Sequence, residues 1–226
     1  MATSATNREL SQFDHFFGAA LAGQWVGVAE NSGSAAIVAG VEGGVVGLIT
    51  GTTSGNRAQL VSGRNLKTVS GSITFKARVK SVTAITTRAL FIGLTDSVSQ
   101  ENPIEIGAGD VVTSTATDAV GFVFDTDATT DKWFVAGVKN DTDTTLTAVN
   151  INGSQVAPVA DVYDDYGITV SPEGHAEFFL NGVFVARIDN CVTPTVLLTP
   201  VILIETRTSG AATAYADFAD CEGTVA

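Results

Sequence analysis

The sequence has 226 residues, enough to bury one substantial core, and β-sandwiches of this size are often single domains. Its formal net charge is −12, with 24 acidic against 12 basic residues, and a surface of that sign argues against nucleic acid as the main partner. Although hydrophobic residues make up 45% of the chain, no apolar run reaches the roughly 18 residues of a membrane helix. The N-terminus shows no signal-peptide pattern, so we expect a soluble protein made in a cytoplasm, without a membrane partner.

The N-terminal segment differs from the rest of the chain. Residues 1–12 are polar and predict a short flexible arm. Leu10, Phe13, Phe17 and Leu21 keep helical spacing, which predicts a short helix near Leu10–Leu21. From Trp25 onward the pattern is that of β-strands.

Short apolar runs bounded by Gly, Thr and Asp predict a series of strands. Gly71–Val82 has the clearest alternation, which points Ile73 and Phe75 inward and Lys76 and Arg78 outward. The expected strands, apart from hairpins, are Val45–Thr50, Gly71–Val82, Arg88–Thr95, Ala119–Asp125, Lys132–Lys139, Val201–Arg207 and Thr213–Phe218.

Tight turns connect further strands. Asn152-Gly153 and Asn181-Gly182 are strong hairpin signals, because a type I′ turn needs positive φ at both central residues. Pro172-Glu173-Gly174 breaks the chain in a similar way, so Tyr166–Ile188 predicts a three-stranded antiparallel meander.

These elements predict an all-β fold, an antiparallel two-sheet β-sandwich, because each strand has one apolar face that needs cover. We expect one domain over residues 13–226 behind the arm. The irregular segment Ser97–Asp118, rich in Gly, Thr and Asp, is the candidate contact loop.

No recognisable catalytic set is present in the sequence. Sugar hydrolases with such sandwiches carry a Glu-x-Asp-x-x-Glu type run on one strand, whereas Glu101 and Glu105 have the wrong spacing and lie in a predicted loop. His175 falls in a predicted turn without an evident orienting partner, and Asp189 lies across a hairpin from it. We therefore predict no enzyme, no catalytic residue and no cofactor-binding residue.

The sequence offers one candidate metal site and two cysteines. Asp125, Asp127 and Asp131 form an oxygen-rich cluster that can hold Ca²⁺, although ordinary turn chemistry is the favoured interpretation, so no metal ligand is assigned. Cys191 and Cys221 are the only cysteines, and two buried thiols are favoured over a disulfide.

Three aromatic residues are candidates for a platform on which a sugar ring stacks. Tyr163, Tyr166 and Trp133 can stack on a sugar if they are exposed, whereas Trp25 and Trp133 are expected to pack in the core or at an edge.

The string of segments as a whole resembles a family of tailed-bacteriophage virion proteins with a concanavalin A-like jelly-roll fold. The resemblance runs from about Phe13 to Phe218, through SITFKARVK, ALFIGLTD and AEFFLNGVFVARI, and TSTATDAVGFVFDTDATTD is its most specific piece. It implies a capsid decoration, or cement, protein on the virion surface, with the major capsid protein as partner. By analogy it implies a homo-oligomer, expected to be a trimer. The alternative is a carbohydrate-binding module of a virion head or tail fibre that contacts surface glycan.

Overall fold

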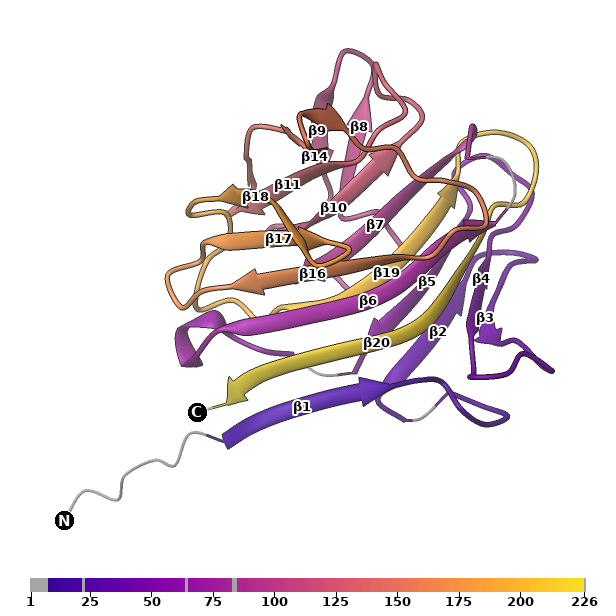
Figure 1. Cartoon of the computed structure of the whole chain (residues 1–226), viewed down its shortest axis with the longest axis horizontal. Helices are drawn as coiled ribbons and strands as arrows, with labels where there is room; N and C mark the ends of the chain where they lie inside the picture. The colour runs from indigo at the N-terminus through magenta and orange to yellow at the C-terminus, as the bar shows by residue number, and fades with distance from the viewer. Residues whose placement is uncertain (1–7, 22, 64, 83–84, 226) are drawn as a thin grey trace.

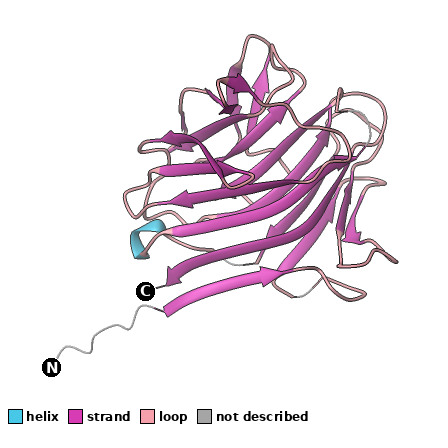
Figure 2. Cartoon of the chain, viewed as in Figure 1, coloured by secondary structure: helices cyan, strands magenta, loops and turns pink. Residues whose placement is uncertain are grey.

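The protein is a sandwich of two antiparallel β-sheets, each of eight strands, as the sequence predicts (Figures 1 and 2). The computed structural model describes residues 8–21, 23–63, 65–82 and 85–225. Among these residues the one helical turn is the 3₁₀ element η1 (Thr68–Ser70). No helix in this part of the chain is long and apolar enough to cross a membrane.

Sheet A carries the longest strands of the molecule. Its order is β18 (Val183–Ile188), β17 (Ala176–Leu180), β16 (Asp164–Val170), β6 (Ile73–Val82), β20 (Thr213–Val225), β4 (Val46–Ile49) and β3 (Ser34–Ile37), with β1 (Arg8–Asp14) also paired to β20. The predicted meander forms three of these strands, and Asn181 and Gly182 take φ of 51° and 76° at its second turn, as a type I′ turn requires.

Sheet B stacks on the inner face of sheet A (Figure 1). Its order is β12 (Thr142–Asp143), β11 (Phe134–Lys139), β10 (Ala119–Asp125), β7 (Arg88–Thr95), β19 (Thr199–Thr206), β5 (Arg57–Ser62) and β2 (Trp25–Ala29), with β13 (Thr147–Ala148) paired to β11. Two small hairpins complete the fold, β8 (Ile104–Gly107) with β9 (Val111–Ser114) and β14 (Asn150–Ile151) with β15 (Ser154–Gln155).

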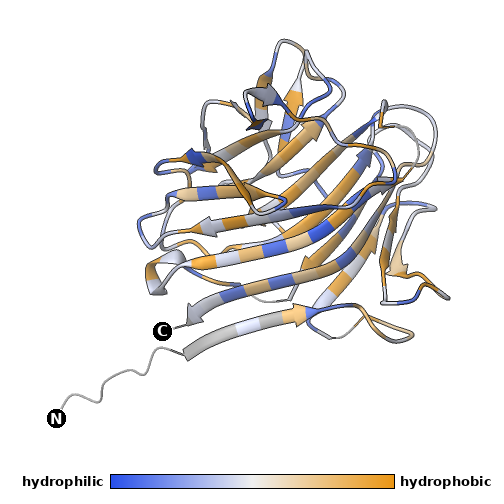
Figure 3. Cartoon of the chain, in the orientation of Figure 1, coloured by the Kyte–Doolittle hydropathy of each residue, from blue (hydrophilic) through white to orange (hydrophobic). Residues whose placement is uncertain are grey.

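The main core lies between the sheets and follows from the period of two in each strand. On β6, Ile73, Phe75, Ala77 and Val79 are at most 2% exposed and face sheet B. The residues between them face solvent, so β6 alternates apolar and polar positions along its length (Figure 3). Sheet A therefore keeps one open face.

The predicted irregular loop Ser97–Asp118 instead contains the β8–β9 hairpin, which folds over the outer face of sheet B. Ile104 and Ile106 join Phe91, Val123 and Leu203 there in a second apolar cluster. Every residue of β7, β10 and β19 is buried as a result, and these strands are apolar at nearly every position rather than alternating.

The predictions for the N-terminus are wrong in part. Residues 8–12, expected in the flexible arm, belong to β1, which pairs along the C-terminal half of β20 from Arg8 opposite Val225 to Asp14 opposite Ala219. This half of β20 extends beyond β4, so its edge would otherwise be unpaired. The predicted helix is absent, because Phe16 takes φ of 58° and packs its ring into the core. Residues 1–7 lie outside the described residues.

Candidate functional site

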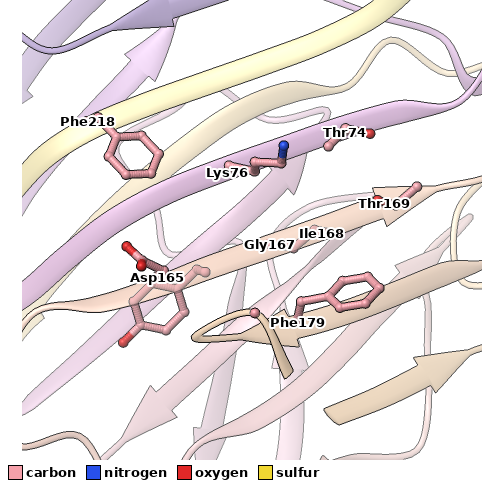
Figure 4. Close-up of a pocket in the computed structure, with 10 residues that line it drawn as sticks. Thr74, Lys76, Asp165, Gly167, Ile168, Thr169, Phe179 and Phe218 are labelled. Atoms are coloured by element: carbon pink, nitrogen blue, oxygen red, sulfur yellow. The ribbon is translucent and has the colours of Figure 1, made fainter. Parts of the chain in front are cut away.

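The open face of sheet A holds a groove over β6, β16, β17 and β20 (Figure 4). Its main hollow has a volume of about 410 Å³. We call this hollow and the smaller one that adjoins it the sheet A groove. The β8–β9 hairpin covers part of the outer face of sheet B, whereas this face of sheet A is open.

Two phenylalanine rings stand at opposite ends of the main hollow, Phe179 on β17 and Phe218 on β20 (Figure 4). Phe179 alternates with the buried Phe178 and Leu180, so it points outward. Phe218 points outward because β20 has a bulge at Asp217, which restores the register of Phe218 opposite Arg78. Its ring lies 5.9 Å from that of Phe13.

The floor of the hollow is low because Gly167 sits at its centre on β16. Gly167 pairs with Lys76 on one side and Phe179 on the other. Its neighbours Tyr166 and Ile168 turn their side chains into the core, where they are 4% and 1% exposed. A strip of bare backbone therefore separates Phe179 from β6.

Polar groups border this strip. Thr74 and Lys76 come from β6, and Asp165 and Thr169 from β16 (Figure 4). Together they offer hydroxyl, ammonium and carboxylate groups beside two apolar rings, which suits a ligand with both hydroxyl groups and apolar faces.

The smaller hollow, of about 270 Å³, continues the groove toward the turn after β16, and Thr169 lines both. Arg187 borders it and contacts Glu177 at 3.3 Å and Asp189 at 2.7 Å. The hydrogen bond and charge of Arg187 hold the pKa of Asp189 below its usual range.

His175 has the carboxylate partner that the sequence did not reveal. Its Nδ1 lies 3.0 Å from Asp189 Oδ1, because the β17–β18 hairpin brings the two residues together. The N–H of Asn190 lies 3.1 Å from the same nitrogen, which accepts this hydrogen bond only when it carries no hydrogen of its own for Asp189. The sequence placed Asp189 across a hairpin from His175 but did not identify it as the partner of this histidine. Ser171 Oγ, the neighbouring hydroxyl, donates instead to Glu173 at 2.7 Å.

The aromatic platform proposed from the sequence is not formed. Trp133 and Tyr166 are 1% and 4% exposed and pack against each other, with ring centroids 5.1 Å apart. Trp25 is also buried in the core. Tyr163 alone of the three platform residues lies at the surface, beneath the Lys80 ammonium at 4.9 Å. Sequence analysis missed Phe179 and Phe218, although alternation in AEFFL was a usable signal for Phe179.

Glu105, one of the two carboxylates weighed for catalysis, lies on the other side of the molecule, in a charged cluster at the edge of the second apolar core. Glu205 bridges Arg57 at 2.8 Å and Arg207 at 2.6 Å, and Glu105 lies 3.6 Å from both guanidinium groups. Glu101 lies exposed before β8. This cluster ties the β8–β9 hairpin to β5 and β19.

Asp125 of the proposed calcium loop belongs to the same cluster. It is fully buried and accepts hydrogen bonds from Arg207, from the Asp127 N–H at 3.0 Å and from the Ile106 N–H at 3.2 Å. Burial raises the pKa of Asp125, against the opposing effect of these donors. Asp127 lies 3.5 Å from Arg207, and Asp131 is exposed in the turn. No group of three or more His, Cys, Asp or Glu in the described ranges is arranged to hold a metal ion.

Comparisons with known proteins identify the fold. No protein-family model and no curated protein matches the sequence. The carbohydrate recognition domain of Emp47p is similar in structure, with a TM-score of 0.60 and 7% identity over 93% of each chain. The kappa-carrageenase from Pseudoalteromonas carrageenovora, in complex with an oligotetrasaccharide, has a TM-score of 0.60 and 13% identity over 99% of this chain and 98% of that one. A Bacteroides ovatus GH16 protein of a mixed-linkage glucan locus has a TM-score of 0.62 and 8% identity over 95% and 99%.

These likenesses show a concanavalin A-like jelly roll, the fold of both lectin domains and GH16 glycosidases. They also overturn the prediction that the chain is not an enzyme. Because the same fold carries a carrageenase and a lichenase, a missing carboxylate run is no ground for excluding catalysis. Nothing in them indicates a phage origin.

Proposed function

We propose that the protein binds carbohydrate in the sheet A groove. The observation that carries this proposal is the pair of phenylalanine rings on either side of the bare Gly167 strip, with hydroxyl, carboxylate and ammonium groups along its border. The apolar C–H face of a sugar ring packs against an aromatic ring, while its hydroxyl groups need hydrogen-bond partners at the edge.

The dimensions of the groove support the same ligand. The main hollow of about 410 Å³ falls within the range of about 300–1,000 Å³ that ligand pockets occupy. The second hollow continues it along β16 through Thr169, so an extended chain of several sugar residues fits better than a single one. Sugar-binding and sugar-cleaving proteins of the same fold give this proposal further weight.

The sequence predicts a more specific role than carbohydrate binding. Decoration of a phage head, the capsid partner, the trimer and the virion location rest on the sequence resemblance alone, and the structural likenesses lend them no support. Of the two roles predicted from the sequence, the alternative, a glycan-binding component of a virion, is the one that agrees with the proposed function.

The test is titration of the full chain with a panel of oligosaccharides. Binding is measured by calorimetry or by NMR chemical-shift changes of residues in sheet A. We expect Phe179→Ala to weaken binding roughly fivefold to tenfold, because one stacking ring is lost. Val111→Ala is the matched control, since Val111 is 60% exposed on the hairpin over sheet B. Its affinity should equal that of the unchanged protein.

Two results would contradict the proposal. One is the absence of binding to every oligosaccharide in the panel. The other is binding that Phe179→Ala and Val111→Ala reduce equally, or shift changes that map to sheet B instead of to β6, β16 and β17.

A further inference from the structure

One strand of the groove presents a row of positive charges. The outward positions of β6 after Thr74 are Lys76, Arg78 and Lys80, and alternation places all three on the open face. From Lys76 to Lys80 the row spans about 13 Å at the usual rise of an antiparallel strand. It starts in the main hollow and ends beside Tyr163 and Tyr215.

Neither lysine of this row is held in a close ion pair in the described part of the chain, although Asp220 lies opposite Lys76 on β20. Within the described ranges, no carboxylate oxygen lies within 4.0 Å of the ammonium of Lys76 or Lys80. Lys80 lies over the rings of Tyr163 and Tyr215, at 4.9 and 5.5 Å from their centroids. A ring face attracts the charge but takes up few of the ammonium N–H donors, which remain free for an anion.

Arg78, between the two lysines, is only loosely paired. Its closest carboxylate oxygens belong to Asp165 at 3.8 Å and Asp217 at 3.7 Å, beyond normal hydrogen-bond length. These two acids nevertheless surround the row with negative charge, as does Asp220 opposite Lys76. A densely charged polyanion would be repelled by them and by the net charge of −12, whereas a chain with widely spaced charges would not.

We propose that the ligand of the sheet A groove is an acidic glycan, a chain whose sugar rings stack on Phe179 and Phe218 while carboxylate or sulfate groups contact Lys76 and Lys80. This inference rests on the proposed carbohydrate binding and adds the class of sugar. Anionic groups recur at regular intervals along such a chain, so a straight row of cations on one strand can meet more than one of them. The ammonium contacts are partly exposed and weaken as salt screens them.

The experiment compares matched acidic and neutral sugars by calorimetry at low and at physiological ionic strength. The probes are an oligogalacturonate and its methyl ester, a sulfated galactan oligosaccharide and its desulfated form, and a single-stranded oligonucleotide. The proteins are the unchanged chain, the double variant Lys76→Gln/Lys80→Gln, and Lys132→Gln as a control in the turn between β10 and β11. Comparing the oligogalacturonate with the sulfated galactan shows which anionic group is preferred.

We expect one acidic probe to bind at least tenfold more tightly than its neutral form, and we expect the double variant to lose this preference while Lys132→Gln keeps it. Because glutamine keeps the bulk of these side chains, the double variant should still unfold cooperatively, and thermal unfolding checks that it is folded. Equal binding of acidic and neutral forms would overturn the inference and leave the proposed function intact. The same inference fails if the double variant keeps the preference or if the oligonucleotide binds as tightly as the acidic sugar. No binding of any sugar would instead refute the proposed function.

Discussion

At the scale of single residues, Gly167 sets the depth of the groove. A Cβ built at this position meets Phe179 Cβ at 3.4 Å, an ordinary contact, and its backbone is extended, so a side chain is sterically allowed. Glycine in a strand interior costs stability through chain entropy and missing packing. We therefore explain glycine at this position by the open space it leaves in the groove, and not by a requirement of the backbone conformation.

Gly167→Thr should separate binding from stability. We expect sugar affinity to fall at least about tenfold, because the new side chain occupies the strip between Phe179 and β6, while the melting temperature stays level or rises because threonine favours a strand. Calorimetric titration and thermal unfolding measure the two effects. Val26→Thr on β2, which is 48% exposed and lies outside the groove, is the control for a threonine placed in a strand. A variant with full affinity would show that the ligand does not cross β16.

The two cysteines are a second residue-scale case. Both are buried cysteines outside a disulfide, as favoured from the sequence, and burial raises the pKa of Cys191 to about 12. At pH 8 the thiolate is then roughly 10⁻⁴ of the total, against about a quarter for an unperturbed thiol.

We expect Cys191 to resist a thiol-specific reagent in the native protein at pH 8, with labelling at least about a thousandfold slower than in the unfolded chain. Mass spectrometry of peptides after timed labelling measures this, and the protein in urea provides the reference. Rapid native labelling of Cys191 would contradict its burial against Gly137.

At the scale of elements, bulges decide which side chains reach the open face. The extra residue Asp217 in β20 lets Tyr215 and Phe218 both point outward, although they are three positions apart. The pairing of β17 with β18 shifts after Phe178, which brings Phe184 opposite Phe179 with rings 5.8 Å apart. Both bulges lie beside the groove, so they support the view that its aromatic edges are a built feature.

The same elements show what the sequence could predict. Alternation and Asn-Gly turns are local signals, and they correctly placed β6, the meander strands and both hairpin turns. The bulge at Asp217 was beyond reach, because it depends on how β20 pairs with β6 and β4. The strand β1 was missed for the same reason: its partner lies more than 200 residues away in the sequence.

The candidate site was harder to predict than the fold. The sequence drew attention to Tyr166 and Trp133, whose size makes them attractive as stacking residues, yet size also makes them good core residues, and they are buried. Phe179, which does line the groove, looked like one more apolar residue in a strand. The ion pairs of Asp125 and Glu105 depend on Arg207, which no local pattern connects to them.

The β8–β9 hairpin gives an element-scale prediction. Arg207 is 11% exposed and faces Asp125 and Glu205, whose side chains are 0% and 2% exposed. Burial disfavours the charge of Arg207, but the hydrogen bond and charge of Asp125, together with Glu205, leave its pKa raised. Arg207→Ala would leave two buried carboxylates short of a partner, so we expect it to lower the free energy of unfolding by about 3–5 kcal/mol.

Arg187→Ala is the matched control for Arg207→Ala. Arg187 also contacts two carboxylates, but it is 48% exposed, and surface ion pairs contribute little. Urea unfolding should separate the two variants, and hydrogen exchange should show faster exchange of the Ile106 amide in Arg207→Ala, because that amide donates to Asp125. Equal stability of the two variants would show that the charged cluster does not hold the hairpin.

At the scale of the whole molecule, acidity governs stability. The chain carries a net charge of −12, and burial raises the pKa of Asp96, Asp164, Asp220 and Glu205 above their usual values. A carboxyl whose pKa is raised by folding binds its proton more tightly in the folded state. Its contribution to stability is therefore complete below the unfolded pKa of about 4 and is lost as the pH rises through the folded pKa.

We accordingly expect the melting temperature to increase as the pH falls from neutral toward the unfolded pKa of about 4, since protonation relieves both the buried charges and the overall repulsion. The increase should end at lower pH, where carboxylates with lowered pKa such as Asp189 lose the ion pairs that stabilise them. Calorimetry at constant ionic strength measures the curve.

Asp220→Asn is the informative variant, because one oxygen of Asp220 is buried without a hydrogen-bond partner. It should raise the melting temperature at pH 7 and flatten the dependence on pH. A melting temperature that falls steadily from neutral pH to about pH 4, or an Asp220→Asn variant with an unchanged slope, would mean that the buried carboxylates are compensated by their surroundings and do not control stability.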